Sequence, residues 1–281
     1  MRRLSVLLLL LVPLAAGCGS ETASLQGSDD ALKDASTSRV EWKLEGGAVP
    51  YWGLFRSTGS IDYANDRGEL VFGGTDSEPD ARVIFVGRDG YLGAKVGDRM
   101  YWERQTSEDT READRFLPGS SAMTPDRLLK DLIKASKKVE KVGSEEIRGV
   151  TTTHYRAHLD RSKLGSDAND NVPEAVDAWI DEQGLPRRVR VPYGNGNDAM
   201  AAVVDLFDFG VPVDVEAPRA SEIVSEDKFD KLMEKECANV KTAKDLEDAN
   251  PLCLLFGTTL EPSGSDIQIS PTETVPTTEG K

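Results

Sequence analysis

Alternating apolar and charged residues in the middle of the chain predict a large antiparallel β-sheet. The segment RVEWKLEGG, residues 39–47, sets Val40, Trp42 and Leu44 among charged neighbours, which is the two-residue period of a half-buried strand. The segment 81–105 holds three apolar runs separated by GRDG and VGDR, two Gly/Asp turn signals that predict a meander of hairpins. With the similar segments 68–74, 149–160, 175–193 and 200–210, we expect about nine to eleven antiparallel strands.

One strongly amphipathic helix is predicted over residues 123–141. Thr124 is placed to cap it and Pro125 suits the first helical position. An apolar stripe must pack on another element. It comprises Leu128, Leu129, Leu132 and Ile133, with Val139 as a candidate fifth member. The lysines of its C-terminal half are either a solvated face that complements the helix dipole or a basic patch for anionic headgroups. These are Lys130, Lys134, Lys137, Lys138 and Lys141.

Two further helical segments are predicted after residue 224. Phe229, Leu232, Met233 and Cys237 fall on one face at helical spacing, and Thr242 with Asp245 resembles a capping box. The even pair Cys237 and Cys253 most simply forms one disulfide in an oxidising compartment. We therefore expect a disulfide-clamped helical hairpin over residues 225–257, packed on the strand region.

The N-terminus has the layout of a lipoprotein signal peptide. Arg2 and Arg3 precede a short apolar run that is too short to span a bilayer, and small residues lead to Cys18. The sequence LAAGC looks like a bacterial lipobox, in which the cysteine thiol is acylated and becomes the first residue of the mature chain. The alternative is a plain secreted protein with an incidental cysteine. With Cys18 acylated, the chain would be lipid-anchored on the extracytoplasmic face of the cell membrane.

Composition divides the remainder of the chain. Residues 1–17 form the signal peptide, residues 18–30 read as the lipidated cysteine and a polar, flexible tether, and residues 31–224 form the folded domain. A short helix is expected to end near residues 32–36. The Thr/Ser/Pro-rich and acidic tail, residues 258–281, lacks the apolar content to fold.

The chain is acidic, and this restricts its partners. Its formal net charge is −15, and removal of residues 1–17 would take away two arginines and leave −17. Such a charge argues against a nucleic-acid partner. The expected partners are the membrane, through the lipid anchor, a lipid or glycolipid ligand, or another protein of the cell envelope, and the chain is expected to be a monomer.

Few residues suit catalysis or metal binding. The two histidines, His154 and His158, would share one face of a strand roughly 13 Å apart, too far to bind one metal ion directly. Asp167, Asn169 and Asn171 have calcium-loop spacing, but Val172 and Ala178 stand where such a loop needs Gly and Glu. The sequence contains no nucleophile elbow, phosphate-binding loop or zinc-protease motif. We therefore expect no cofactor, no metal and no enzymatic activity.

Three segments in order, GVTTTHYRAHLDRSKL, VDAWIDEQGLPRRVRV and VPVDVEAPRASEIV, carry a family resemblance over roughly residues 28–224. The chain resembles the actinobacterial LppX/LprG-type lipoproteins, whose fold is similar to that of the carrier LolA. The matching residues are His154, Tyr155, Asp160, Trp179, Asp181, Gly184, Leu185 and Pro186. The resemblance implies an α+β fold: a LolA-like open half-barrel, in which helices cross the concave side of a strongly curved antiparallel sheet and enclose an apolar cavity. The segment after residue 224 lies outside the family pattern.

A lipid- or glycolipid-binding lipoprotein is the first functional hypothesis. The candidate cavity residues, each of which has an ordinary core role as the alternative, are Trp42, Phe55, Ile84, Leu92, Trp102, Leu128, Leu132 and Ile133. The second hypothesis is a protein-binding or sensing lipoprotein with a filled barrel, and the third is an enzyme.

Overall fold

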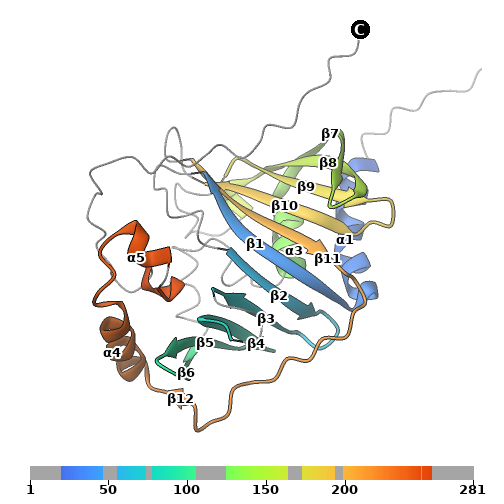
Figure 1. Cartoon of the computed structure of the whole chain (residues 1–281). Coiled ribbons are helices and arrows are strands. Elements are labelled where there is room, and N and C mark those ends of the chain that lie inside the picture. The colour runs from blue at the N-terminus through green and yellow to red at the C-terminus, as the bar shows by residue number, and fades with distance from the viewer. Residues whose placement is uncertain are drawn as a thin grey trace, which may run out of the picture.

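The computed structural model describes residues 20–46, 56–73, 78–105, 125–163, 173–193, 199–247 and 249–254. Figure 1 shows a large, open, curved sheet accompanied by helices. The helical elements are α1 (Ser20–Ala35), α3 (Pro125–Ala135), η2 (Arg161–Lys163), α4 (Glu226–Cys237), α5 (Ala243–Glu247) and η4 (Pro251–Leu254). The strands are β1 (Thr37–Gly46), β2 (Arg56–Asp62), β3 (Arg67–Phe72), β4 (Ala81–Val86), β5 (Asp89–Val96), β6 (Arg99–Gln105), β7 (Ser136–Ile147), β8 (Val150–Leu159), β9 (Ala175–Asp181), β10 (Pro186–Tyr193), β11 (Met200–Phe207) and β12 (Ile223–Val224).

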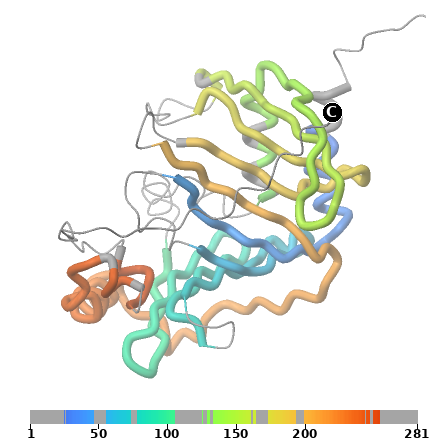
Figure 2. The backbone as a smooth tube through the Cα atoms, turned by 45° about the horizontal axis from the view of Figure 1, so that its top comes forward, coloured from blue at the N-terminus to red at the C-terminus, as the bar shows by residue number. Residues whose placement is uncertain are grey.

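The sheet consists of two antiparallel meanders. The strand order β12-β6-β5-β4-β3-β2-β1-β11-β10-β9-β8-β7 joins β1–β6 to β7–β11 through the pairing of β1 with β11, where Val40 lies opposite Leu206. Glycines at positive φ close two of the predicted turns, Gly87 between β4 and β5 and Gly97 between β5 and β6. Figure 2 shows how the strands follow one another across the curved sheet.

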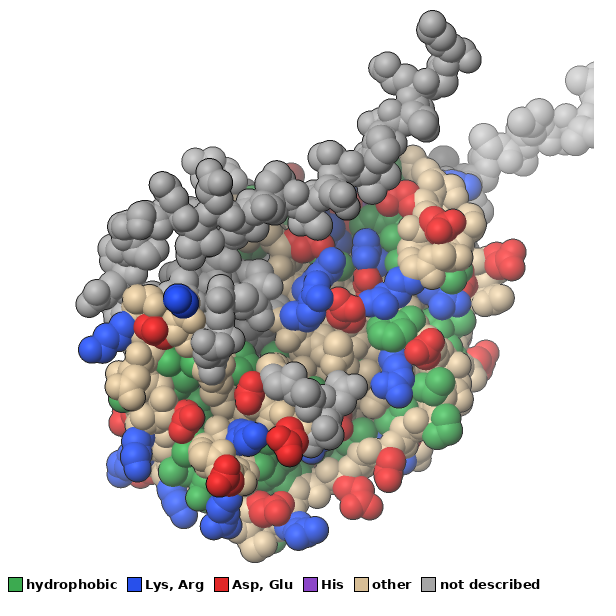
Figure 3. All heavy atoms as spheres, viewed as in Figure 1, with side chains coloured by type: hydrophobic (Ala, Val, Ile, Leu, Met, Phe, Trp, Pro, Cys, Tyr) green, Lys and Arg blue, Asp and Glu red, His purple; other side chains and the backbone are tan. Residues whose placement is uncertain are grey.

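The sheet has two chemically different faces because side chains alternate along each strand. We call the face that carries Val40, Leu44, Phe85 and Leu206 the core face, since these residues belong to the largest buried cluster. The opposite face carries many ion pairs; the guanidinium of Arg188, for example, donates to the carboxylate of Asp205 at 2.7 Å. Figure 3 shows Lys, Arg, Asp and Glu side chains spread over this opposite face.

Two groups of helices pack on the core face. Leu32 of α1 and Leu129 of α3 are buried there, and Figure 1 shows both helices behind the sheet. Phe229 and Met233 of α4 and Leu252 of η4 are buried at the other end, where the core face of β3–β6 supplies small and aromatic partners. The core face is thus covered from both ends of the sheet.

The C-terminal segment contains the predicted disulfide. Cys237 and Cys253 are bonded, with Cα atoms 5.3 Å apart, and join the end of α4 to η4. The capping box also forms: Thr242 N–H donates to Oδ2 of Asp245, and Asp245 N–H donates to Oγ1 of Thr242. The second helical segment is shorter than the sequence predicts, since it divides into α5 and η4.

The predicted flexible tether over 18–30 is wrong for its larger part, because α1 already begins at Ser20. Leu25 and Leu32, two helical turns apart, are 2% and 0% exposed and fix one side of this polar helix to the fold. An ion pair of 2.7 Å between Lys33 and Asp29, one turn apart, adds support. The predicted end of this helix near residue 35 is confirmed.

The helix predicted over 123–141 is shorter than expected. It ends at Ala135, and Ser136 begins β7, which pairs with β8 along its whole length. The hairpin closes through Arg148 and Gly149, both at positive φ, as a two-residue turn of type I′ requires. Long-range strand pairing therefore outweighs the helical propensity of the lysine-rich segment.

The sheet has one strand more than the upper limit predicted. β2 is polar and gave no alternation signal, and β12 is a two-residue strand that pairs in parallel with β6. Among the described helices, none is long and apolar enough to cross a membrane.

Candidate functional site

The structure brings only part of the predicted cavity set together. Trp42, Leu92 and Ile133 pack against the large cluster of the core face. Ile84 and Trp102 do not join them, because they lie on the opposite face in a separate cluster with Tyr91 and Val215. Phe55 and the side chains of Leu128 and Leu132 lie outside what the structure describes.

The error for Ile84 and Trp102 has a simple cause. In β4, Val83 and Phe85 belong to the core face, so Ile84 between them points the other way. Tyr101 packs on the core face, so the side chain of the next residue, Trp102, points to the opposite face. Both faces of β4–β6 are apolar, so hydrophobicity alone did not identify which face a residue occupies.

A row of apolar side chains crosses the core face between the two helical groups. Leu70, Val83 and Leu92 lie opposite one another on β3, β4 and β5, and all three are only partly buried. The row continues to Gly59 of β2, opposite Leu70. A Cβ atom at Gly59 would lie 1.9 Å from the carbonyl oxygen of Glu69, so no side chain fits there. We call Leu70, Val83 and Leu92 the apolar row; of these, only Leu92 was predicted from the sequence as a cavity residue.

The hydroxyl of Ser57, next to this row, has no hydrogen-bond partner in the part of the chain that the structure describes. Ser57 of β2 pairs with Trp42 of β1 on one side and with Phe72 of β3 on the other. It is 1% exposed. Burial of a hydroxyl group without a hydrogen-bond partner is energetically costly.

The two histidines lie on the opposite face and have separate carboxylate partners. Nε2 of His154 is 2.9 Å from Oδ1 of Asp177, and Nε2 of His158 is 3.1 Å from Oε2 of Glu140. Hydrogen bonds from Lys138 and His158 lower the pKa of Glu140. Within the described ranges, no group of three or more His, Cys, Asp and Glu side chains is arranged to hold a metal ion.

The predicted lysine patch is divided between a helix and a strand. Lys130 and Lys134 are exposed on α3, whereas Lys137, Lys138 and Lys141 are exposed on β7. Lys138 forms an ion pair with Glu140 of the same strand. The lysines therefore do not form one face of a single helix.

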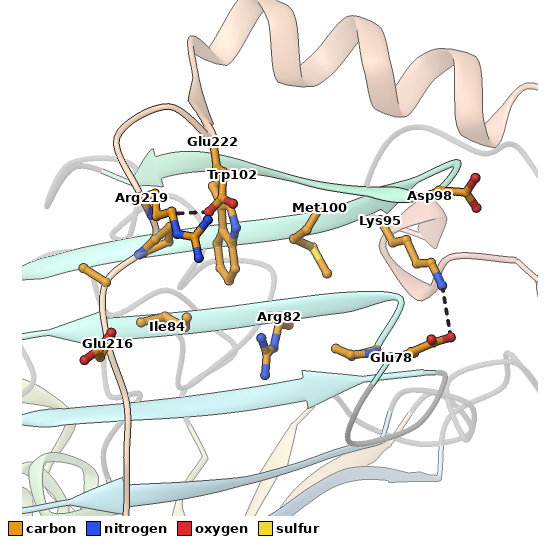
Figure 4. Close-up of a pocket in the computed structure, with 13 residues that line it drawn as sticks. Glu78, Arg82, Ile84, Lys95, Asp98, Met100, Trp102, Glu216, Arg219 and Glu222 are labelled. Carbon is orange, nitrogen blue, oxygen red and sulfur yellow. Dashed lines mark hydrogen bonds and ion pairs between the residues drawn. The ribbon is translucent and has the colours of Figure 1, made fainter.

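A groove of about 560 Å³ lies on the opposite face, beside the segment that runs from β11 to β12. We call residues 208–222 the return segment. Ile84, Met100 and Trp102 supply apolar lining from β4 and β6, while residues 216–219 and Glu222 line the side formed by the return segment. Figure 4 shows these side chains beneath the loop that leads to β12.

The sheet holds the return segment on both sides of the groove. Arg67 donates through Nη1 to the carbonyl of Val215 at 3.2 Å, and Trp102 N–H donates to the carbonyl of Glu222 at 3.1 Å. Val215 is 3% exposed and packs in the cluster of Ile84 and Trp102. The residues between these two attachments form one side of the groove.

A glycine makes the floor of this groove possible. A Cβ atom at Gly93, which faces Trp102 across β5 and β6, would lie 2.7 Å from two carbon atoms of the indole. Only glycine lets the Trp102 ring lie this close to the neighbouring strand. The indole can then form a flat apolar surface beside Met100.

The charged lining of the groove is partly paired. Lys95 lies 3.9 Å from Glu78, and the backbone N–H of Arg219 donates to Glu222 at 3.4 Å. Nε of Arg82 forms an ion pair of 2.6 Å with Oε1 of Glu69. Burial nevertheless raises the pKa of Glu69, because it outweighs the effect of the nearby Arg82 charge. The guanidinium of Arg219 has no hydrogen-bond or ion-pair partner in the part of the chain that the structure describes.

No protein-family model matches the chain. Its sequence is 26% identical over 249 residues to an uncharacterized 31.2 kDa protein encoded in the rplA–rplJ intergenic region of Streptomyces griseus, with 73% of this chain and 79% of that protein covered.

Several solved structures are similar in outline. The lipoprotein LppX of Mycobacterium tuberculosis is 16% identical with a TM-score of 0.48, covering 70% of this chain and 98% of LppX. LprF of Mycobacterium bovis is 12% identical with a TM-score of 0.46, covering 72% and 98%. A LolA superfamily protein of Nitrosomonas europaea is 11% identical with a TM-score of 0.30, covering 70% and 94%. Because these TM-scores are below 0.5, what the chain binds must be inferred from its own residues.

Proposed function

We propose that this chain is an extracytoplasmic lipoprotein that binds a lipid or glycolipid by its acyl chains, without catalysing a reaction. In this proposal the acyl chains lie on the core face of the sheet, against the apolar row and between the two helical groups. The observation that carries the proposal is the in-register row of partly buried Leu70, Val83 and Leu92, which ends at the side-chain-free position Gly59.

The chemistry of the row suits a hydrocarbon ligand. Burial of apolar surface contributes roughly 25 cal/mol per Å², and an alkyl chain offers this surface without polar groups that need partners. The unpaired hydroxyl of Ser57 can donate to an ester or carboxyl oxygen at the polar end of such a ligand. The core face thus offers one polar contact beside an apolar surface.

Val83 and Val86 provide a matched test on one strand. Both are partly buried, but Val83 belongs to the core face and Val86 to the opposite face. We expect Val83→Gln to weaken binding of the neutral probe N-phenyl-1-naphthylamine by about threefold to tenfold, since one buried valine contributes on the order of 1 kcal/mol. Val86→Gln should leave binding within about twofold. Equal effects of the two changes on probe fluorescence would contradict the site.

The membrane anchor is proposed from the lipobox sequence alone. Acylation of Cys18 would attach the chain firmly, because each buried methylene contributes roughly 0.8 kcal/mol. We expect Cys18→Ala to abolish incorporation of radiolabelled palmitate and to release the exported protein from the membrane fraction. A variant that remains labelled and membrane-bound would refute this anchor.

A protein-binding lipoprotein is the second candidate. Phe229 and Met233 are fully buried against the core face of β3–β6, so the C-terminal segment fills one end of the space that a ligand would use. In that case the core face holds no lipid, and purified protein carries none under conditions in which a known carrier retains its ligand.

A further inference from the structure

We propose that the groove between the return segment and β4–β6 is a second binding site, for an anionic amphiphile. The ligand class is a phosphate or carboxylate group attached to a short apolar or aromatic portion. The site lies on the face of the sheet opposite the apolar row, so it does not depend on the lipid site proposed above.

The apolar portion has a surface prepared for it. Ile84, Met100 and Trp102 line one side of the groove, and Figure 4 shows the indole and the thioether side by side. The absence of a side chain at Gly93 allows the indole to take this position. A volume of about 560 Å³ is within the range of small-molecule sites.

The anionic group has the guanidinium of Arg219 available. Arg219 reaches the groove from the return segment (Figure 4), and its side chain has no partner among the described residues. Arg82 lines the groove from β4 and adds positive charge nearby, although its Nε is already paired with Glu69 at 2.6 Å. Guanidinium groups bind oxyanions with strong, directed hydrogen bonds.

The acidic residues of the lining limit the charge of the ligand. Glu78 is paired with Lys95, Glu222 accepts the Arg219 N–H, and Figure 4 shows Asp98 pointing away from the other lining side chains. Glu216 remains at the edge of the groove. The lining therefore favours one anionic group over a polyanion.

Two probes that differ by a single sulfonate distinguish this groove from the lipid site. 8-Anilinonaphthalene-1-sulfonate carries an oxyanion on an aromatic body, and N-phenyl-1-naphthylamine is the same body without it. On the full mature chain, we expect Arg219→Gln to weaken binding of the sulfonate probe by about tenfold or more. The affinity for the neutral probe should change by less than about twofold. The neutral probe reports on Val83 and the apolar row, so either proposal can fail without the other.

Arg39→Gln is the control for charge alone, because Arg39 is exposed on the same face and lies outside the groove. Sulfonate binding that is unchanged in Arg219→Gln, or that falls equally in Arg39→Gln, would overturn the proposal. Gly93→Ala is an independent variant that displaces the Trp102 indole, and it too should weaken binding of the sulfonate probe.

Competition then identifies the source of the anion. We expect dodecyl phosphate, below its micelle concentration, to displace the sulfonate probe at a concentration at least about tenfold lower than inorganic phosphate, because only the former can contact Met100 and Trp102. Equal potency of the two compounds would refute an amphiphile site.

Discussion

The imidazole of His154 lies flat against the indole of Trp179, with ring centroids 4.3 Å apart and an interplanar angle of 12°. The two residues face each other in the pairing of β8 with β9. Asp177, two residues before Trp179 and on the same face, accepts hydrogen bonds from Arg156 and contacts His154. The histidine that the sequence offers for chemistry is therefore part of a buried polar cluster that joins two strands.

This cluster predicts a pH-dependent stability. Burial by itself would raise the pKa of Asp177, but hydrogen bonds from Arg156 and His154 outweigh it and hold the pKa below its ordinary 3.8. The stabilisation is thus fully present above about pH 4 and is lost as the pH falls through the lowered value.

We expect Asp177→Asn to reduce the free energy of unfolding by about 1–3 kcal/mol at neutral pH, and the difference from the unmodified chain should shrink below about pH 3. Urea unfolding followed by circular dichroism at both pH values measures it. A difference that does not change with pH would show that the charge of Asp177 is not involved.

The hydrogen bonds accepted by Asp181 predict that this residue stabilises the turn between β9 and β10. Its side chain is 1% exposed, Oδ1 accepts the backbone N–H groups of Gln183 and Leu185, and Oδ2 accepts from Arg187. We expect Asp181→Ala to lower the free energy of unfolding by about 2–4 kcal/mol, because these buried donors lose their acceptor. Glu182→Ala, at an exposed neighbour, is the control. Similar midpoints in urea for the two variants would count against this account.

The roles of Asp181 and His154 show what the sequence could predict. Asp181 and Gly184 are among the residues that carry the family resemblance, and the structure explains both: Asp181 organises the turn between β9 and β10, and Gly184 supplies a positive φ. Local patterns of this kind, including the capping box at Thr242, are settled by neighbours within a few residues.

Other features depended on distant contacts. The helicity of residues 20–30 depends on Leu25 and Leu32 packing on elements far along the chain, and β7 depends on its hairpin with β8. The burial of Ile84 and Trp102 on the opposite face depends on the return segment, whose Val215 packs against them. No local periodicity carries this information.

The burial of Leu25 predicts that the first part of α1 belongs to the folded domain and is not a tether. Leu25 is 2% exposed in a buried cluster with Val139 and Tyr155, so Leu25→Ala should lower the free energy of unfolding by about 2–5 kcal/mol. Lys33→Ala, at an exposed position of the same helix, should change it by less than about 1 kcal/mol. Chemical denaturation of both variants decides the point, and a small effect of Leu25→Ala would restore the tether.

The disulfide predicts that the C-terminal segment is stabilised covalently. In the loop-entropy model, a closed loop of this length contributes about 3 kcal/mol. Replacing Cys237 and Cys253 together by Ala should lower the free energy of unfolding by about this amount under oxidising conditions. With reducing agent present, the unmodified chain should unfold at nearly the same urea concentration as the variant. If neither the double substitution nor the reducing agent alters the urea concentration at the midpoint of unfolding, the prediction is wrong.

Native mass spectrometry tests the central claim, lipid binding on the core face, most directly. The chain from Gly19 onward, exported without its acylated cysteine, should carry a lipid at close to one molecule per chain, and organic extraction should release it. In Val83→Gln the bound fraction should fall, and in Val86→Gln it should not. A ligand-free mass, obtained under conditions in which a known lipid carrier keeps its ligand, would contradict the claim. It would favour the second candidate function, a protein-binding lipoprotein whose core face is filled by its own side chains.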